Sequence, residues 1–130
     1  MINRLDHIGI SVSDLERSKA FFDQALKPLG ISRLYEAPGA FSGYGVPDKI
    51  FFWIGPAGDQ KIGASHIAFL AENRLDVDAF YQAALSAGGR DHGAPGLRPH
   101  YHPDYYGAFI LCPDGHNIEA VCHAPERPGS

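Results

Sequence analysis

The feature that most constrains the fold of this chain is an internal repeat. Residues 5–10 read LDHIGI and residues 64–69 read ASHIAF, so His7 and His66 hold the same place in two segments related by a shift of 59 positions, from 7 to 66. The shift also superimposes Phe21 on Phe80, Phe22 on Tyr81, Ala25 on Ala84, Leu26 on Leu85 and Gly30 on Gly89. A shift held over this length is typical of a duplicated structural unit. We therefore expect one domain over residues 1–130, with a first module over about 1–58 and a second over about 59–130.

The first module begins with the pattern of a strand followed by a helix. Residues 5–12 alternate between an apolar face and a small, polar face that carries His7. Ser13 and Glu16 have the spacing of a capping box, which predicts a helix start, and Gly30 predicts its end. Strands are then expected over about 31–36, 40–44 and 50–54, separated by Pro and Gly turns.

The second module repeats this order. A strand that carries His66 precedes a helix, for which we expect a cap at Asp76 and an end at Gly88 and Gly89. Residues 106–112 and 117–122 flank Pro113-Asp114-Gly115 and predict a hairpin. Each half therefore reads as β-α-β-β-β, and the fold class is α+β.

Three side chains are expected on the sheet faces that do not pack against helices. In the last strand, Ile118, Ala120 and Cys122 form the apolar face, which leaves Glu119 on the other. His7, His66 and Glu119 then form a set of two imidazoles and one carboxylate that suits a divalent transition metal. The alternative for each histidine alone is a hydrogen-bonded or exposed side chain without a ligand.

These same segments resemble a known family. Residues 5–8, Asp14-Leu15-Glu16-Arg17-Ser18, residues 66–69 and Pro113 to Glu119 are similar to the vicinal oxygen chelate superfamily, which includes glyoxalase I, extradiol dioxygenases, fosfomycin-resistance proteins and bleomycin-resistance proteins. The resemblance covers nearly the whole chain. It implies paired modules that form a cup-shaped mixed sheet, a homodimer, and metal ligands at His7, His66 and Glu119.

The chain also departs from each subfamily. Glyoxalase I has a fourth ligand, a glutamate, on the strand over residues 50–54, where our alignment of this strand with the last one puts Phe51 opposite Glu119. Extradiol dioxygenases carry a tyrosine where this chain has Phe109, and fosfomycin-resistance proteins a threonine where it has Gly9. Bleomycin-binding proteins have the fold without the metal.

Further candidate residues lie in two segments. Phe51 and Trp53 form an apolar wall that is either a substrate surface or core. Residues 90–106 read as a long loop, in which Arg98 and Tyr105 are candidates for substrate binding and His100, His102 and Tyr106 for catalysis by proton transfer. The alternative is a solvated, proline-rich loop. We expect the remaining histidines at the surface or at edges: His92, His116 and His123.

Composition limits the possible partners. A net charge of −4 and the lack of a basic cluster argue against nucleic acid or a membrane surface, which leaves a small molecule as the expected partner. The N-terminus runs directly into a strand pattern, so we expect a cytoplasmic protein. Cys112 and Cys122 match no zinc or redox motif and are expected to be structural.

The sequence therefore predicts a metal-dependent enzyme that binds a small substrate through two adjacent oxygens. A lyase or isomerase related to glyoxalase I is the leading reaction, by resemblance. The alternatives are an Fe(II) extradiol-type dioxygenase and a non-catalytic binding protein similar to bleomycin-resistance proteins. Imidazole and carboxylate ligands suit Fe, Mn, Ni, Co and Zn alike, so the element stays open.

Overall fold

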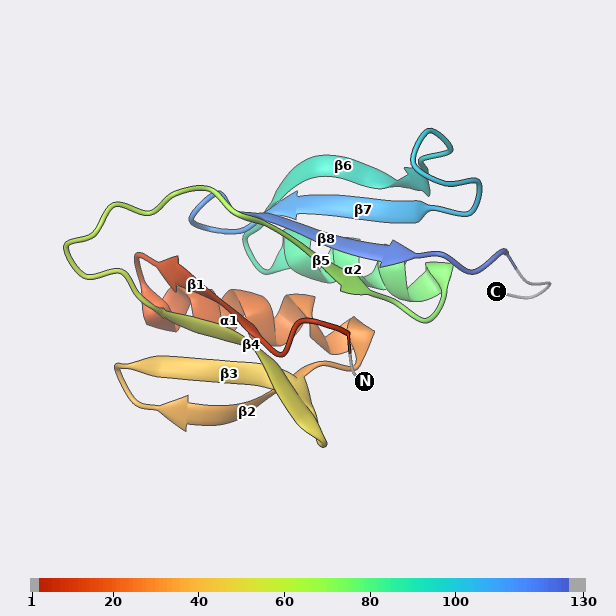
Figure 1. Ribbon diagram of the computed structural model, residues 1–130. Helices are drawn as coiled ribbons and strands as arrows, with labels where there is room; N and C mark the ends of the chain where they lie inside the picture. Colours follow the sequence, from red (N-terminus) through yellow and green to blue (C-terminus); the bar gives the residue numbers. More distant parts are fainter. Residues whose placement is uncertain (1–2, 127–130) are drawn as a thin grey trace.

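A computed structural model describes residues 3–126 (Figure 1). The elements follow in this order: β1 (Ile8–Val12), α1 (Leu15–Ala25), the 3-10 turn η1 (Lys27–Leu29), β2 (Ser32–Ala37), β3 (Phe41–Val46), β4 (Lys49–Pro56), β5 (His66–Leu70), α2 (Arg74–Ser86), β6 (Arg90–Leu97), β7 (Tyr106–Leu111) and β8 (Asn117–Cys122).

The two modules have the same topology. In module 1, from β1 to β4, the strand order is β1-β4-β3-β2, with β1 parallel to β4 and the other pairs antiparallel. In module 2, from β5 to β8, the order is β5-β8-β7-β6, with β5 parallel to β8. The predicted β-α-β-β-β pattern and the α+β class are confirmed. Among the described residues the strands form two four-stranded sheets, one for each module.

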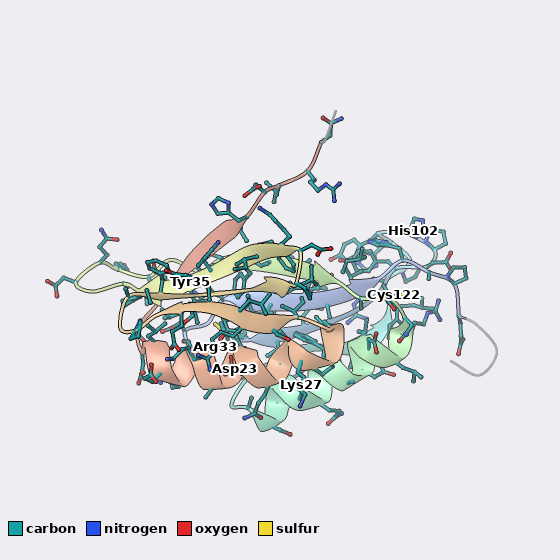
Figure 2. The ribbon with its side chains drawn as sticks, turned by 90° about the horizontal axis from the view of Figure 1, so that it is seen from below. Asp23, Lys27, Arg33, Tyr35, His102 and Cys122 are labelled. Atoms are coloured by element: carbon teal, nitrogen blue, oxygen red, sulfur yellow. The ribbon has the colours of Figure 1, made fainter. Side chains whose placement is uncertain are left out.

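The core lies between the sheets and the helices. Figure 2 shows α1 and α2 on one side of the strands, which leaves the opposite side of both sheets open. Phe52 on β4 contacts Phe69 on β5, with ring centroids 5.2 Å apart, so the core continues from one module to the other. A Cβ at Gly89 would lie 2.8 Å from Phe21 Cε1 and 2.6 Å from Ile110 Cγ2, so only glycine fits where α2 meets its neighbours.

The N-cap residues of both helices differ from those predicted. The N-cap of α1 is Asp14 rather than Ser13, because the Asp14 carboxylate accepts the Arg17 amide hydrogen at 3.1 Å. The N-cap of α2 is Asn73, whose side chain accepts from the Asp76 amide at 2.9 Å, so Asp76 lies in the first turn. Gly30 and Gly88 have φ of 77° and 102°, which confirms them as left-handed residues after the helical segments.

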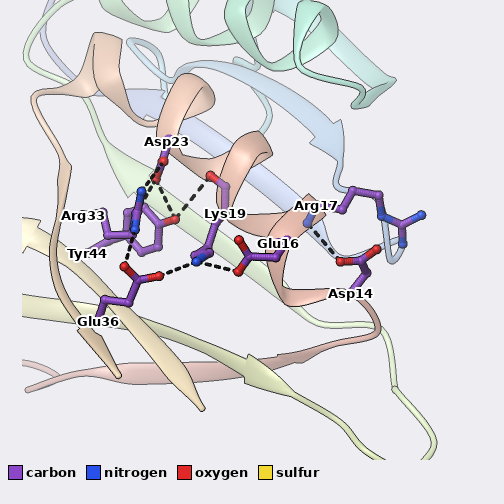
Figure 3. A network of polar contacts seen from close by, with 8 residues as sticks. All are labelled: Asp14, Glu16, Arg17, Lys19, Asp23, Arg33, Glu36 and Tyr44. Carbon is purple, nitrogen blue, oxygen red and sulfur yellow. Dashed lines mark hydrogen bonds and ion pairs between the residues drawn. The ribbon is translucent and has the colours of Figure 1, made fainter. Parts of the chain in front are cut away.

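A charged network fixes the outer strands of module 1 to α1 (Figure 3). Arg33 on β2 makes two hydrogen bonds to Asp23, at 3.1 and 3.0 Å, and pairs with Glu36 at 3.0 Å. The buried Tyr44 donates its hydroxyl to Asp23 at 2.9 Å, and Lys19 pairs with Glu36. These contacts hold the edge strand β2, whose residues 32–36 are exposed.

His116 corrects a prediction, because it is buried rather than at the surface. Only 1% of the residue is exposed. Its Nε2 donates to the carbonyl of Ser11, at the end of β1, over 2.9 Å, while its Nδ1 accepts from the amide of Ser65 at 3.1 Å. His116 thus links module 2 to the carboxyl end of β1.

The segment 90–106 is also not a single loop. Residues Arg90–Leu97 form β6, which pairs with β7, and only residues 98–105 form the connection between them. The bulges between Asp91 and Gly93 and between Gly93 and Gly96 explain why the sequence lacks a clear strand pattern there.

Cys112 and Cys122 are buried free thiols, as predicted for structural cysteines. Among the residues that the structure describes, no helix has the length and apolar character needed to cross a membrane.

Candidate functional site

The first strands of the two modules present their small and polar residues on the open side of the sheets. On β5, Ile67 and Phe69 are buried, whereas His66 and Ala68 are exposed. On β1, Ile10 and Val12 are buried whereas Gly9 and Ser11 are exposed, and the exposed His7 lines the same groove as Gly9 and Ser11. Both histidines are exposed, at equivalent places in the two modules.

His66 and Glu119 form the centre of the site. Their strands β5 and β8 are parallel neighbours, and Glu119 pairs in register with Ala68, two residues from His66. This register brings His66 Nε2 within 2.8 Å of Glu119 Oε1. Glu119 is 1% exposed, while the His66 side chain is 54% exposed. A buried carboxylate is costly without partners, and the His66 imidazole is one partner of Glu119.

Tyr105 binds the second oxygen of Glu119. Its hydroxyl donates to Glu119 Oε2 from the end of the 98–105 connection. Burial, and then this hydrogen bond, raise the pKa of the Tyr105 hydroxyl above its usual value, so it stays protonated and able to donate. Both oxygens of Glu119 thus have a partner in the chain.

His7 lies apart from this pair. Its Nδ1 donates to Asp6 Oδ1 at 2.6 Å, and Asp6 Oδ2 pairs with Lys49 at 2.7 Å. Residues 3–126 contain no group of three or more His, Cys, Asp and Glu side chains close enough to hold a metal ion. The structure therefore joins two of the three predicted ligands and does not bring His7 to them.

The packing of the modules explains this separation. Ser65, directly before His66, is linked through His116 to Ser11 at the carboxyl end of β1. His7 precedes the amino end of the same strand, four residues earlier, which is about 13 Å at the usual rise of a strand. Within one chain, His66 therefore lies near the carboxyl end of β1, whereas His7 lies before its amino end.

The register of module 1 also corrects the alignment of its last strand. Gly9 pairs with Trp53, as Ala68 pairs with Glu119, and Gly9 and Ala68 are equivalent by the 59-residue shift. Trp53, and not Phe51, therefore occupies the place of Glu119. Neither residue is able to bind a metal.

Trp53 lines an open groove of about 480 Å³ with His7. Tyr35, Phe41 and Trp53 form an aromatic cluster in which each pair of ring centroids is 5.7 to 5.8 Å apart. A Cβ at Gly43 would lie 2.6 Å from the Trp53 ring, so this glycine makes room for the indole. Phe51 is only partly exposed and packs against the core rather than lining this groove.

The candidates from the second module divide between the two faces. Arg98 lies on the open side, with its guanidinium 5.5 Å from the Phe109 ring, and Phe109 lies 6.1 Å from the His66 ring. Tyr106 faces the helices instead, where its hydroxyl donates to Asp78 at 2.6 Å. Burial, and then that contact, raise the pKa of Tyr106 to about 12, which does not suit proton transfer near neutrality.

His100 and His102 are exposed residues of the 98–105 connection and make no hydrogen bond to His66 or Glu119. His102 Nδ1 accepts from the Asp104 amide at 3.1 Å, and His100 packs against Tyr101 with ring centroids 4.1 Å apart. In Figure 2, His102 lies at one end of the molecule and Tyr35 over the other module. A catalytic role for either histidine stays a prediction.

Comparison with known proteins agrees with the duplicated fold. Residues 4–120 match the family described as the glyoxalase/bleomycin resistance protein/dioxygenase superfamily. The crystal structure of a glyoxalase/bleomycin resistance protein from Albidiferax ferrireducens is 32% identical, with a TM-score of 0.76 over 95% of this chain and 98% of that chain. The chain belongs to this superfamily.

Two other proteins are similar to this chain at lower sequence identity. The uncharacterized protein YqjT of Bacillus subtilis is 28% identical over 90% of this chain and 97% of its own length. A lactoylglutathione lyase from Agrobacterium tumefaciens is 14% identical, with a TM-score of 0.69 over 93% of this chain and 94% of that chain. At that identity the likeness extends to the fold alone.

The superfamily includes metal enzymes, and the His66 and Glu119 pair fits a divalent metal. Imidazole and carboxylate ligands lie about 2.0 to 2.2 Å from a bound zinc ion, so two of them at the tetrahedral angle are about 3.4 Å apart. The observed 2.8 Å between Nε2 and Oε1 is a hydrogen-bond distance shorter than that spacing, and the half-exposed His66 side chain has room to move outward. His7 also has a suitable orientation, because a ligand histidine commonly donates its other ring nitrogen to a carboxylate, as His7 does to Asp6.

Sequence reasoning did not single out Asp6 as the partner of His7. The available signal was the adjacency of Asp6 and His7, which has no counterpart at Ser65 and His66. It also overlooked Gly107, where a Cβ would lie 3.4 Å from Glu119 Oε2. No local pattern distinguishes that glycine from those that serve turns.

Proposed function

We propose that this protein is a metal-dependent lyase or isomerase of the superfamily that acts on a small substrate bound through two adjacent oxygens. His66, Glu119 and His7 are the proposed ligands of one divalent metal ion. The observation that supports this proposal most directly is the Glu119 carboxylate, which is 1% exposed yet in contact with the exposed His66 imidazole on the open face of the sheet.

Glu119 is difficult to explain as a structural residue. The hydrogen bonds with His66 and Tyr105 offset only part of the desolvation cost of the buried carboxylate, whereas a divalent cation would offset more of it. An ordinary surface position would avoid the cost altogether. The Glu119 side chain is instead buried in contact with the exposed His66 imidazole, which favours a role in holding a cation.

The third ligand is proposed to come from a second copy of the chain. His7 belongs to the site by its orientation toward Asp6 but is about 13 Å along β1 from the point nearest His66. A two-fold dimer in which module 1 of one subunit faces module 2 of the other brings His7 to His66 and Glu119. The exposed apolar side chains of the open face, such as Leu70 at 71% exposed, would be covered in such a dimer.

The bound metal would act as a Lewis acid that stabilises negative charge on two adjacent substrate oxygens. The chain itself supplies the surroundings. Arg98, on the same face of module 2, is placed to attract an anionic group, and Trp53 offers an apolar wall from module 1. These residues are proposed to orient the substrate rather than to transfer protons.

The first test is elemental analysis of protein purified without chelator or nickel resin. We expect near-stoichiometric metal in the wild type and its loss in Glu119→Ala and His66→Ala. The element found separates an iron-dependent dioxygenase from a redox-inert lyase. Absence of metal from the wild type, even after reconstitution, would contradict the proposal.

A mixing experiment tests the shared site. His7→Ala and Glu119→Ala chains are each expected to bind no metal as homodimers. After denaturation and refolding together, each mixed dimer would contain one complete site, because its intact His7 and its intact Glu119 come from different chains. A site formed within one chain would show no such recovery.

A second candidate is a small-molecule binding protein without catalysis. The aromatic cluster Tyr35, Phe41 and Trp53 beside the 480 Å³ groove favours it, since exposed rings on a concave surface bind apolar ligands. This candidate predicts tight ligand binding that Glu119→Ala does not change.

A further inference from the structure

We propose that Tyr105 is a positioning residue for Glu119, which it holds so that the carboxylate binds the metal through Oε1 alone. This inference rests on the proposed function, because it concerns the same metal ligand. The 98–105 connection would then serve the metal site by fixing the carboxylate from the side opposite His66.

The two oxygens of Glu119 have different partners. Oε1 faces His66 Nε2 at 2.8 Å, and Oε2 accepts the Tyr105 hydroxyl. The Tyr105 bond fixes the rotation of the carboxylate and occupies the oxygen that a bidentate ligand would use. Hydrogen bonds of this kind to a ligating carboxylate orient the ligand and tune its affinity for the metal.

Tyr105 itself is held firmly in place. Its carbonyl accepts from the Arg98 amide at 2.7 Å, and its amide donates to the His102 carbonyl at 3.0 Å, so both backbone groups are bonded within the hairpin connection. Its ring packs edge-on against Tyr101 and His123, with centroids 5.0 and 5.2 Å away. The backbone bonds and the ring contacts therefore orient the Tyr105 hydroxyl toward Glu119.

Gly107 supplies the space for this contact. A Cβ at this position would lie 3.1 Å from Tyr105 Cε1 and 3.4 Å from Glu119 Oε2. The φ of Gly107 is not in the left-handed region, so backbone conformation does not require glycine there. Glycine at position 107 instead leaves room for Tyr105 to approach Glu119 closely.

The experiment is a titration of the intact, metal-free protein with Co²⁺, followed by its visible absorption, for the wild type and three variants. Tyr105→Phe removes only the hydroxyl. We expect its dissociation constant for Co²⁺ to rise about 10- to 100-fold, the usual cost of removing a partner of a metal ligand. We also expect its absorption spectrum to change, because Glu119 is freed to bind through both oxygens.

Tyr101→Phe is the matched control. Tyr101 is in the same connection, is 61% exposed, and forms no side-chain hydrogen bond within the described residues. Its Co²⁺ affinity and spectrum should equal those of the wild type. Gly107→Ala keeps the Tyr105 hydroxyl but crowds its ring, and should weaken Co²⁺ binding in the same direction. Thermal melting of each variant verifies that it is folded.

The outcomes separate the two proposals. Wild-type affinity and spectrum in Tyr105→Phe would overturn the role of Tyr105 while leaving the metal site in place. Equal losses in Tyr105→Phe and Tyr101→Phe would also overturn it, because the connection as a whole would then be responsible. Failure of the wild type to bind Co²⁺ would overturn the proposed function, and this inference with it.

Discussion

Replacing His116 by alanine should destabilise the protein strongly, although the residue lies in a turn. The imidazole is 1% exposed and bonds the Ser11 carbonyl and the Ser65 amide at once. Each neutral hydrogen bond contributes roughly 1 kcal/mol, and buried backbone groups left without a partner add a comparable cost. With the loss of buried side-chain contacts, the expected decrease in the free energy of unfolding is about 2 to 4 kcal/mol.

Graded variants test this reasoning. His116→Gln can retain a donor toward Ser11 but lacks an acceptor placed for Ser65, so about half of the loss is expected. His92→Ala removes an exposed imidazole from β6 and should change stability by less than about 0.5 kcal/mol. Urea unfolding, followed by Trp53 fluorescence and by circular dichroism, gives the free energy for each variant. A loss in His116→Ala no greater than in His92→Ala would refute the proposed link between the modules.

Three further predictions concern other parts of the fold. Contact with Lys19 holds the pKa of Glu36 below its ordinary value of 4.5, so this contact stabilises the fold above that value and is lost as the pH falls; Lys19→Met should therefore reduce the difference between urea stabilities measured at neutral pH and near pH 3. Gly89→Ala should lower the melting temperature by several degrees, because its Cβ would lie 2.6 Å from a side-chain carbon of Ile110; an unchanged melting temperature would show that α2 shifts freely. Tyr106→Phe loses its bond to Asp78 and should cost about 0.5 to 1.5 kcal/mol in urea unfolding, with no change in metal content.

Features that depend on local periodicity were predictable from the sequence. The repeat gave the topology of both modules, and the alternation of β8 placed Glu119 on the open face beside His66. Helix starts were predicted but their caps were not, because Ser13 and Asp14 are both good capping residues and only the geometry decides between them. β6 was missed because its bulges bring Gly and Pro into a strand.

Features that depend on the packing of the two modules were not predictable. The turn sequence around His116 gives no sign that β1 of the other module lies beside it. The equivalence of Trp53 with Glu119 could be found only from the strand register. Because β4 has eight residues and β8 has six, their sequences can be aligned in more than one way. The distance of His7 from His66 follows from the same inter-module packing.

The two modules carry different side chains at equivalent positions, and this difference decides which pair of modules is able to form the proposed metal site. Module 1 offers His7 with Asp6 behind it and has Trp53 at the place of the carboxylate, whereas module 2 offers His66 and Glu119. Two copies of module 1 would supply two imidazoles without a buried carboxylate, so the proposed three-ligand site needs module 1 opposite module 2. A two-fold dimer contains that combination twice, and the proposal therefore requires one metal ion per chain. A measured ratio of one metal per dimer would contradict it, because a single site on the two-fold axis would have to be built from two copies of the same module.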